Sequence, residues 1–150
     1  MVVKNRVVIG IATGGGVGYI PFAPGTFGSL LGLVFYVGLA DLPFIAYGVI
    51  VAALGLIGVW ASTAAEQLLG EKDASVIVID EVAGLLIALW GMPPDRYLLI
   101  ALGFGLFRLF DIIKPWPALE RLPRGWGVMM DDVFAGILAQ AVWRGLLWFI

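Results

Sequence analysis

The 150-residue chain contains no cysteine and no histidine. The absence of cysteine excludes a disulfide framework, a thiol nucleophile and a cysteine metal site. Without histidine there is no imidazole base and no phosphohistidine intermediate, so any chemistry must use carboxylates, lysine and hydroxyl groups. Charged residues make up only 13% of the chain, and the net charge of −2 excludes the strongly basic surface that is typical of nucleic-acid-binding proteins.

Hydrophobic residues, by contrast, make up 61% of the chain, above the usual globular share of about 45–50%. This composition predicts an integral membrane protein, and the absence of a linker predicts a single domain over residues 1–150. Five apolar segments predict an all-α bundle of about five hydrophobic helices, at residues 28–40, 44–61, 76–92, 97–110 and 132–150. The second and fifth segments would span about 27 Å as helices, whereas the first and fourth are short for a membrane span. Glycines within the segments predict close helix packing.

The distribution of basic residues predicts an orientation. If the N-terminus is cytoplasmic, five spans place residues 1–27, 62–75 and 111–131 on one side of the membrane. With Arg108 at the adjoining helix end, seven lysines and arginines fall on that side and two on the other, as the positive-inside rule requires. We therefore expect a multi-pass membrane protein whose unusual loops face the cytoplasm.

Two pairs of adjacent acids interrupt this apolar sequence. In "IVIDEVAGLLIALW", Asp80 and Glu81 are expected one or two turns inside a helix that begins near Ser75. In "GVMMDDVFAGILAQAVW", Asp131 and Asp132 are expected at a helix start, where N-capping is an alternative role for one of the two. Acids within an apolar run are costly and usually functional. Because the chain has no histidine or cysteine, its metal ligands would all be oxygens, and these suit Mg²⁺ or a similar hard ion.

Basic residues and glycines complete the unusual sequence. In "FRLFDIIKPWP", Arg108, Asp111 and Lys114 follow one another at intervals of three residues, which puts them on one face of a helix. An ion-pair ladder at the membrane boundary is one interpretation, and a clamp for a phosphate is the other. The loop "ATGGGVGYIPFAPGTFGS" leads into a helix and offers backbone N–H groups to a phosphate, although it is not a Walker A loop.

In their order and spacing, "GGGVGYIPFAPGTFGS", "ASVIVIDEVAG", "FRLFDIIKPWP" and "GVMMDDVFAG" resemble the bacterial phosphatidylglycerophosphatase A family. The resemblance implies an Mg²⁺-dependent phosphatase of the bacterial inner membrane that converts phosphatidylglycerophosphate into phosphatidylglycerol. It implies functional roles for matching residues of three kinds: the acids Asp80, Glu81, Asp111, Asp131 and Asp132, the base Lys114, and the loop residues Pro24, Gly25, Thr26, Gly28 and Ser29.

From these residues we expect metal-activated water to attack phosphorus directly. The five acids are the candidate metal ligands, with Glu81 as a ligand or a general base, and Gly25, Thr26, Ser29, Arg108 and Lys114 are the candidate substrate contacts. A covalent aspartyl-phosphate is the minor alternative, since the usual D-x-D-x-[TV] motif is absent. Two other functions stay open, a lipid-phosphate transferase and a small ion- or proton-conducting membrane protein. The expected partners are the lipid substrate and the bilayer, with no nucleic acid, and the oligomeric state is left open.

Overall fold

The computed structural model describes residues 2–149, and within them every regular element is a helix. The α-helices are α1 (Val2–Ala12), α2 (Pro24–Leu39), α3 (Phe44–Leu69), α4 (Ile79–Ala88), α5 (Tyr97–Ile113) and α6 (Gly125–Trp148), and two 3₁₀ turns are η1 (Val17–Tyr19) and η2 (Leu119–Arg121). The predicted all-α class is confirmed. The described residues form six α-helices and not about five, because α1 was not predicted from its short apolar piece.

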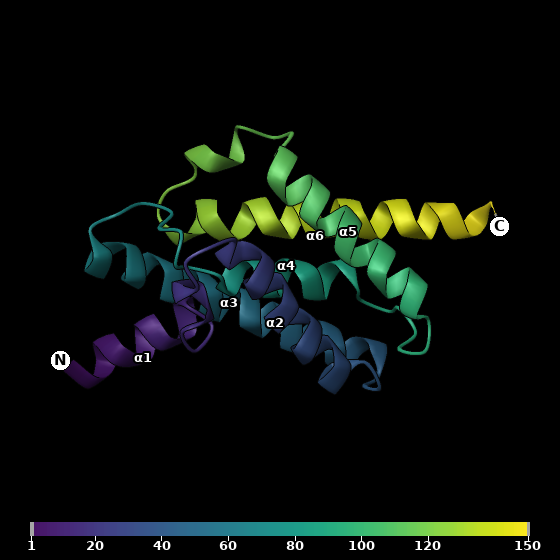
Figure 1. Ribbon diagram of the computed structural model, residues 1–150, viewed down its shortest axis with the longest axis horizontal. Coiled ribbons are helices and arrows are strands. Elements are labelled where there is room, and N and C mark those ends of the chain that lie inside the picture. Colours follow the sequence, from purple (N-terminus) through teal and green to yellow (C-terminus); the bar gives the residue numbers. More distant parts are fainter. Residues whose placement is uncertain (1, 150) are drawn as a thin grey trace.

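The short helix α4 is the centre of the bundle. Helices α2, α3, α5 and α6 all pack against it, and α1 packs against α3 (Figure 1). The α4 side chains Val82, Leu85 and Leu86 are completely buried. Ten residues of helix extend only about 15 Å, half of the hydrocarbon thickness of a bilayer. The predicted span over 76–92 is therefore wrong: this segment is a core helix that its neighbours cover.

The helices run alternately between two ends of the bundle. At one end, the Tyr36 hydroxyl donates a hydrogen bond to the Met92 carbonyl over 2.8 Å, and the Trp90 ring stacks on Phe44 with 4.8 Å between ring centroids. These contacts join the α2–α3 turn to the α4–α5 connection. The starts of α2, α4 and α6 and the ends of α3 and α5 therefore lie toward the other end. The sequence predicted this grouping of the unusual loops from the number of helices between them.

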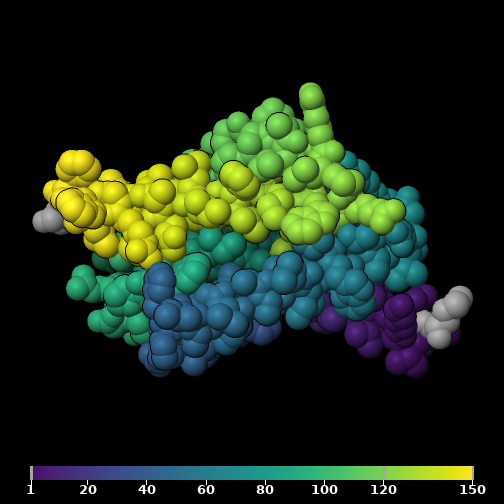
Figure 2. Space-filling model, turned by 180° about the vertical axis from the view of Figure 1, so that it is seen from behind, coloured from purple at the N-terminus to yellow at the C-terminus, as the bar shows by residue number. Residues whose placement is uncertain are grey.

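Helix α3 is, among the described residues, the one that is long and apolar enough to cross a membrane. Only 22% of its most apolar 18-residue window is buried within the protein. Large apolar side chains such as Ile45, Val49 and Leu56 point outward, and Figure 2 shows α3 (blue) forming much of one face beside α6 (yellow). An exposed apolar helix of this length supports association with a membrane.

Glycines bring α4 and α6 into close contact. A Cβ atom at Gly84 would lie 2.7 Å from the carbonyl oxygen of Asp132 and 2.6 Å from the Phe107 ring, so no larger residue fits there. The prediction of close packing is confirmed for this glycine. It is wrong for Gly55 and Gly105, because a Cβ atom there would have no neighbour within 4 Å. The contact at Gly84 matters for the site, since it sets how near Asp132 comes to the first turn of α4.

Candidate functional site

Each acidic pair lies where the sequence predicted the other. The pair expected inside a helix lies at a helix start, and the pair expected at a helix start lies inside a helix. Helix α4 begins only at Ile79, so Asp80 and Glu81 lie in its first turn, where the helix dipole favours negative charge. Helix α6 begins at Gly125, so Asp131 and Asp132 lie nearly two turns inside it, and the N-capping interpretation of that pair is wrong. The error arose because the glycines and methionines before Asp131 do not show an apolar helical pattern.

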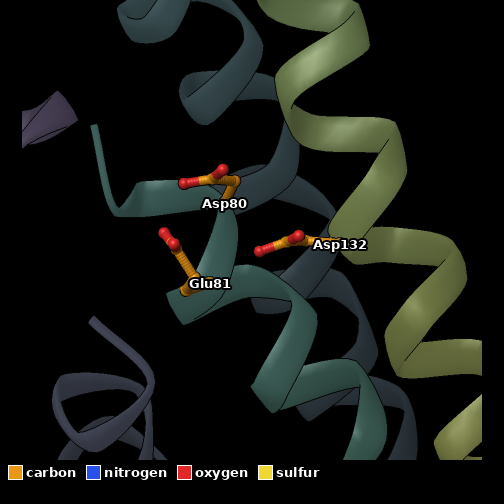
Figure 3. Close-up of side chains that lie close together, drawn as sticks. All are labelled: Asp80, Glu81 and Asp132. Carbon is orange, nitrogen blue, oxygen red and sulfur yellow. The ribbon is translucent and has the colours of Figure 1, made fainter. Parts of the chain in front are cut away.

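Asp80, Glu81 and Asp132 converge on one point. Their carboxylate oxygens offer one atom each, all within 4.8 Å of one another. Asp80 and Glu81 extend from the first turn of α4, and Asp132 extends toward them from α6 (Figure 3). Asp80 is 7% exposed and Asp132 is 2% exposed. We call these three residues the carboxylate cluster.

The hydrogen bonding of the carboxylate cluster fits a bound cation. Asp80 Oδ1, Glu81 Oε2 and Asp132 Oδ2 are buried and have no hydrogen-bond partner within the protein. Buried polar atoms are almost always paired, and close carboxylates repel one another in a medium of low dielectric constant. A hard divalent ion would satisfy the three oxygens and offset their charge, and an all-oxygen ligand set suits Mg²⁺.

The other two predicted metal ligands, Asp111 and Asp131, each pair with a base. Asp111 forms an ion pair with Arg108, one turn earlier on α5. Asp131 accepts a hydrogen bond from Lys114 Nζ over 3.4 Å. Asp111 remains close enough to Asp132 and Glu81 to interact electrostatically with both. The structure therefore places these two acids beside the carboxylate cluster, not within it.

The helix end in "FRLFDIIKPWP" directs Lys114 toward α6. Helix α5 ends at Ile113, and Lys114 takes a left-handed backbone conformation, with φ of 45°, before the first proline. The predicted ion-pair ladder is present between Arg108 and Asp111. It does not extend to Lys114, which forms its ion pair with Asp131. Partial burial disfavours the charged lysine, but nearby carboxylates, Asp131 foremost, outweigh it and raise the Lys114 pKa. Lys114 is thus a cation near the cluster.

The start of α2 forms a third side of the site. A Cβ atom at Gly25 would lie 2.5 Å from Glu81 Oε1 and 3.2 Å from Arg108 Nη1, so the absence of a side chain keeps space between these two groups. Arg108 Nη2 also donates to the Thr26 hydroxyl over 3.4 Å. Residue Pro24 is the first of the helix. The predicted contacts Gly25, Thr26 and Arg108 therefore meet beside Glu81.

Two other predicted loop residues lie deeper in the bundle. Ser29 is completely buried, and its hydroxyl donates to the Gly25 carbonyl over 2.9 Å. A Cβ atom at Gly28 would lie 2.7 Å from Val78 Cβ and 3.4 Å from Glu81 Cβ. In this arrangement Ser29 braces the first turn of α2 and Gly28 lets α2 approach α4. Direct contact of Ser29 with a substrate stays a prediction.

A small cavity opens beside Asp131, and the sequence did not predict it. Its volume is about 290 Å³, and it is lined by Lys72, Asp73, Gly127, Val128 and Asp131. The residues Lys72 and Asp73 come from the segment between α3 and α4. Lys72 was counted among the basic residues of the cytoplasmic side, but no spacing motif connected either residue with the site.

The site combines carboxylates that have unpaired oxygens with an arginine, a lysine and a helix start that contains glycine. These are the chemical groups of a phosphate-processing enzyme. Comparison with known sequences agrees with this class: the profile of phosphatidylglycerophosphatase A matches residues 10–147. The chain belongs to the phosphatidylglycerophosphatase A family, a family of phosphatases.

Individual relatives cover most of the chain. Phosphatidylglycerophosphatase A of Escherichia coli K12 is 35% identical over 93% of this chain and 81% of that protein. The protein of the same name from Haemophilus influenzae is 40% identical over 88% of this chain and 83% of its own length. A Bacteroides thetaiotaomicron protein named "Putative phosphatidylinositol-3-phosphatase" is 44% identical over 85% of each chain. No solved structure is significantly similar to the chain.

Proposed function

We propose that the protein hydrolyses the terminal phosphomonoester of phosphatidylglycerophosphate, giving phosphatidylglycerol and inorganic phosphate, with Mg²⁺ as cofactor. The observation that carries the proposal is the carboxylate cluster, whose buried oxygens lack partners, beside the paired groups of Arg108 and Thr26. Membership of the family and the names of two relatives support the choice of substrate.

In the proposed reaction, Asp80, Glu81 and Asp132 would hold Mg²⁺, which supplies charge neutralisation and activation of water. A water oxygen forms a bond to phosphorus, and the bond from phosphorus to the glycerol oxygen breaks. The two water protons end on that glycerol oxygen and on the released phosphate. The protein contributes position and charge, because phosphoryl transfer depends mainly on these.

The basic residues would stabilise the charge of the transferred group. Arg108 lies between Asp111 and Thr26, so its guanidinium is oriented before substrate arrives. Gly25 leaves space between this guanidinium and Glu81. Lys114 is fixed by Asp131 on the other side. Such preorganised donors lower the barrier because they need little rearrangement in the transition state.

The substrate phosphate is anchored to a lipid, so the site should lie at a membrane surface. The outward-facing apolar residues of α3 support a location in the bilayer, and the carboxylate cluster lies toward the end of the bundle at which α3 terminates. We propose that this end faces the cytoplasm, as the excess of lysine and arginine in its loops indicates. The gathering of the acids toward one end argues against an ion-conducting path through the bundle.

A second candidate substrate is phosphatidylinositol 3-phosphate, because the Bacteroides relative is named a putative phosphatidylinositol-3-phosphatase. Phosphate release from the two lipids by the purified protein in detergent, with Mg²⁺ or with excess chelator, tests both candidates. We expect Mg²⁺-dependent release from phosphatidylglycerophosphate. Equal release after thorough chelation would refute the metal role, and release from phosphatidylinositol 3-phosphate alone would refute the first substrate.

A further inference from the structure

The cavity beside Asp131 lies next to the carboxylate cluster but is chemically different from it. Asp132 belongs to the cluster and Asp131, its neighbour on α6, lines the cavity. Lys114 approaches the same Asp131 carboxylate. The residues that line the cavity therefore include two acids, Asp73 and Asp131, and one lysine, Lys72.

Such a lining suits hydroxyl groups better than a further phosphate. The two carboxylates offset the charges of Lys72 and Lys114, so the lining has no net positive charge to hold an anion, whereas a hydroxyl can donate to a carboxylate and accept from a lysine at once. Both candidate lipids carry their phosphomonoester on a polyol, glycerol in one case and inositol in the other. A phosphate at the carboxylate cluster would leave that polyol beside the cluster, where the cavity opens.

The segment that brings Asp73 to the cavity is held by a buried acid, Glu66. This residue of α3 is 9% exposed, and its side-chain oxygen Oε1 accepts a hydrogen bond from the Asp73 backbone N–H over 2.8 Å. The Glu66 carbonyl also accepts a hydrogen bond from the N–H of Gly70, which ends the helix, over 2.9 Å. Glu66 thus fixes both the start and the middle of the loop.

The backbone of Asp73 takes a left-handed conformation. Its φ is 52°, in a region that asparagine and aspartate adopt more readily than most residues with a side chain. The hydrogen bond from its backbone N–H to Glu66 Oε1 holds Asp73 in this conformation.

We propose that this cavity binds the polyol of the lipid headgroup, with Asp73 and Lys72 as its specificity-determining contacts and Glu66 as a positioning residue. The proposal rests on the proposed function, because it assumes that the phosphomonoester occupies the carboxylate cluster. It explains how the enzyme would distinguish a headgroup that has a free hydroxyl group from one that has none.

The test compares phosphatidylglycerophosphate with an analogue whose headgroup glycerol lacks the free hydroxyl. The variant Asp73→Gly removes the carboxylate and keeps the backbone, since glycine adopts positive φ without strain. In wild type, kcat/KM for the natural lipid should exceed kcat/KM for the analogue by about tenfold or more. The loss of a hydrogen bond to a charged group usually has an effect of this size. Asp73→Gly should abolish this preference, because neither lipid then has a carboxylate at this position to contact. Glu71→Gln, an exposed change on the same loop, should keep the preference.

The positioning role has its own readout. Glu66→Ala should speed hydrogen–deuterium exchange in segment 70–78 and reduce the preference, whereas Glu66→Gln keeps an acceptor oxygen and should preserve both. Equal kcat/KM values for the two lipids in wild type, or an equal fall for both in Asp73→Gly, would overturn the polyol site. A wild-type protein that cleaves neither lipid with Mg²⁺ would instead overturn the proposed function.

Discussion

Replacing Asp132 by asparagine should lower activity and raise the stability of the metal-free protein. Asp132→Asn keeps the side-chain shape but removes one charge from the carboxylate cluster. Asp132 is 2% exposed, and its Oδ2 atom has no hydrogen-bond partner within the protein. Loss of a group that organises the transition state costs about 3 kcal/mol, so kcat should fall by roughly a hundredfold or more.

The effect on stability should have the opposite sign when metal is absent. Two ionised carboxylates separated by 4.8 Å, the outer limit of the cluster, repel by about 3 kcal/mol at an effective dielectric constant of about 20. Asp132→Asn removes two such repulsions, so the metal-free variant should unfold at a temperature several degrees above wild type. Added Mg²⁺ should stabilise wild type strongly and the variant weakly, because only wild type keeps the full ligand set.

Thermal unfolding in detergent, with chelator and across a Mg²⁺ series, measures this reversal, and phosphate release gives the rates. Asp41→Asn is the matched control, since it makes the same chemical change at an exposed residue on the α2–α3 turn. That control should match wild type in both assays. The reasoning fails if Asp132→Asn turns over normally at low Mg²⁺, or if it melts below wild type in chelator while binding Mg²⁺ equally well.

Three further substitutions test the neighbouring groups. Lys114→Ala should lower kcat and raise KM together, because a phosphate clamp acts in the ground and transition states, and excess Mg²⁺ should not rescue it; full rescue by Mg²⁺ would show that the lysine only supports the metal ligands. Gly25→Ala should reduce phosphate release at least tenfold with little change in melting temperature, because its Cβ atom would crowd Glu81 and Arg108, and unchanged release would contradict that geometry. Gly84→Ala should destabilise the protein by about 1–3 kcal/mol in denaturant unfolding, because the contact between α4 and α6 has no space for a methyl group. Gly105→Ala, where that space is open, should be neutral or slightly stabilising, and equal losses for the two changes would refute the packing argument.

Composition and local pattern were enough to predict much of this protein. The excess of apolar residues predicted helices with outward-facing apolar surfaces, and α3 has one. The two prolines after Lys114 mark the end of α5, because proline cannot continue a helix and restricts the residue before it. Counting the helices between the unusual loops predicted that these loops would lie at the same end, since alternating helices return to it, and Asp80 and Asp132 meet there.

Packing between helices decided the rest. The buried position of α4 comes from the four helices around it, so its apolar sequence could not show that it was a core helix and not a span. The depth of Asp132 within α6 depends on a helix start at Gly125 that no capping residue marks. Whether a carboxylate faces another carboxylate or a base is likewise a property of neighbouring helices. The spacing of Asp111 and Asp131 therefore could not predict that Arg108 and Lys114 would pair with them. Residue type determined which chemical groups were available. Tertiary contacts determined which of these groups lie together in the site, because side chains distant in sequence interact only after the helices have packed.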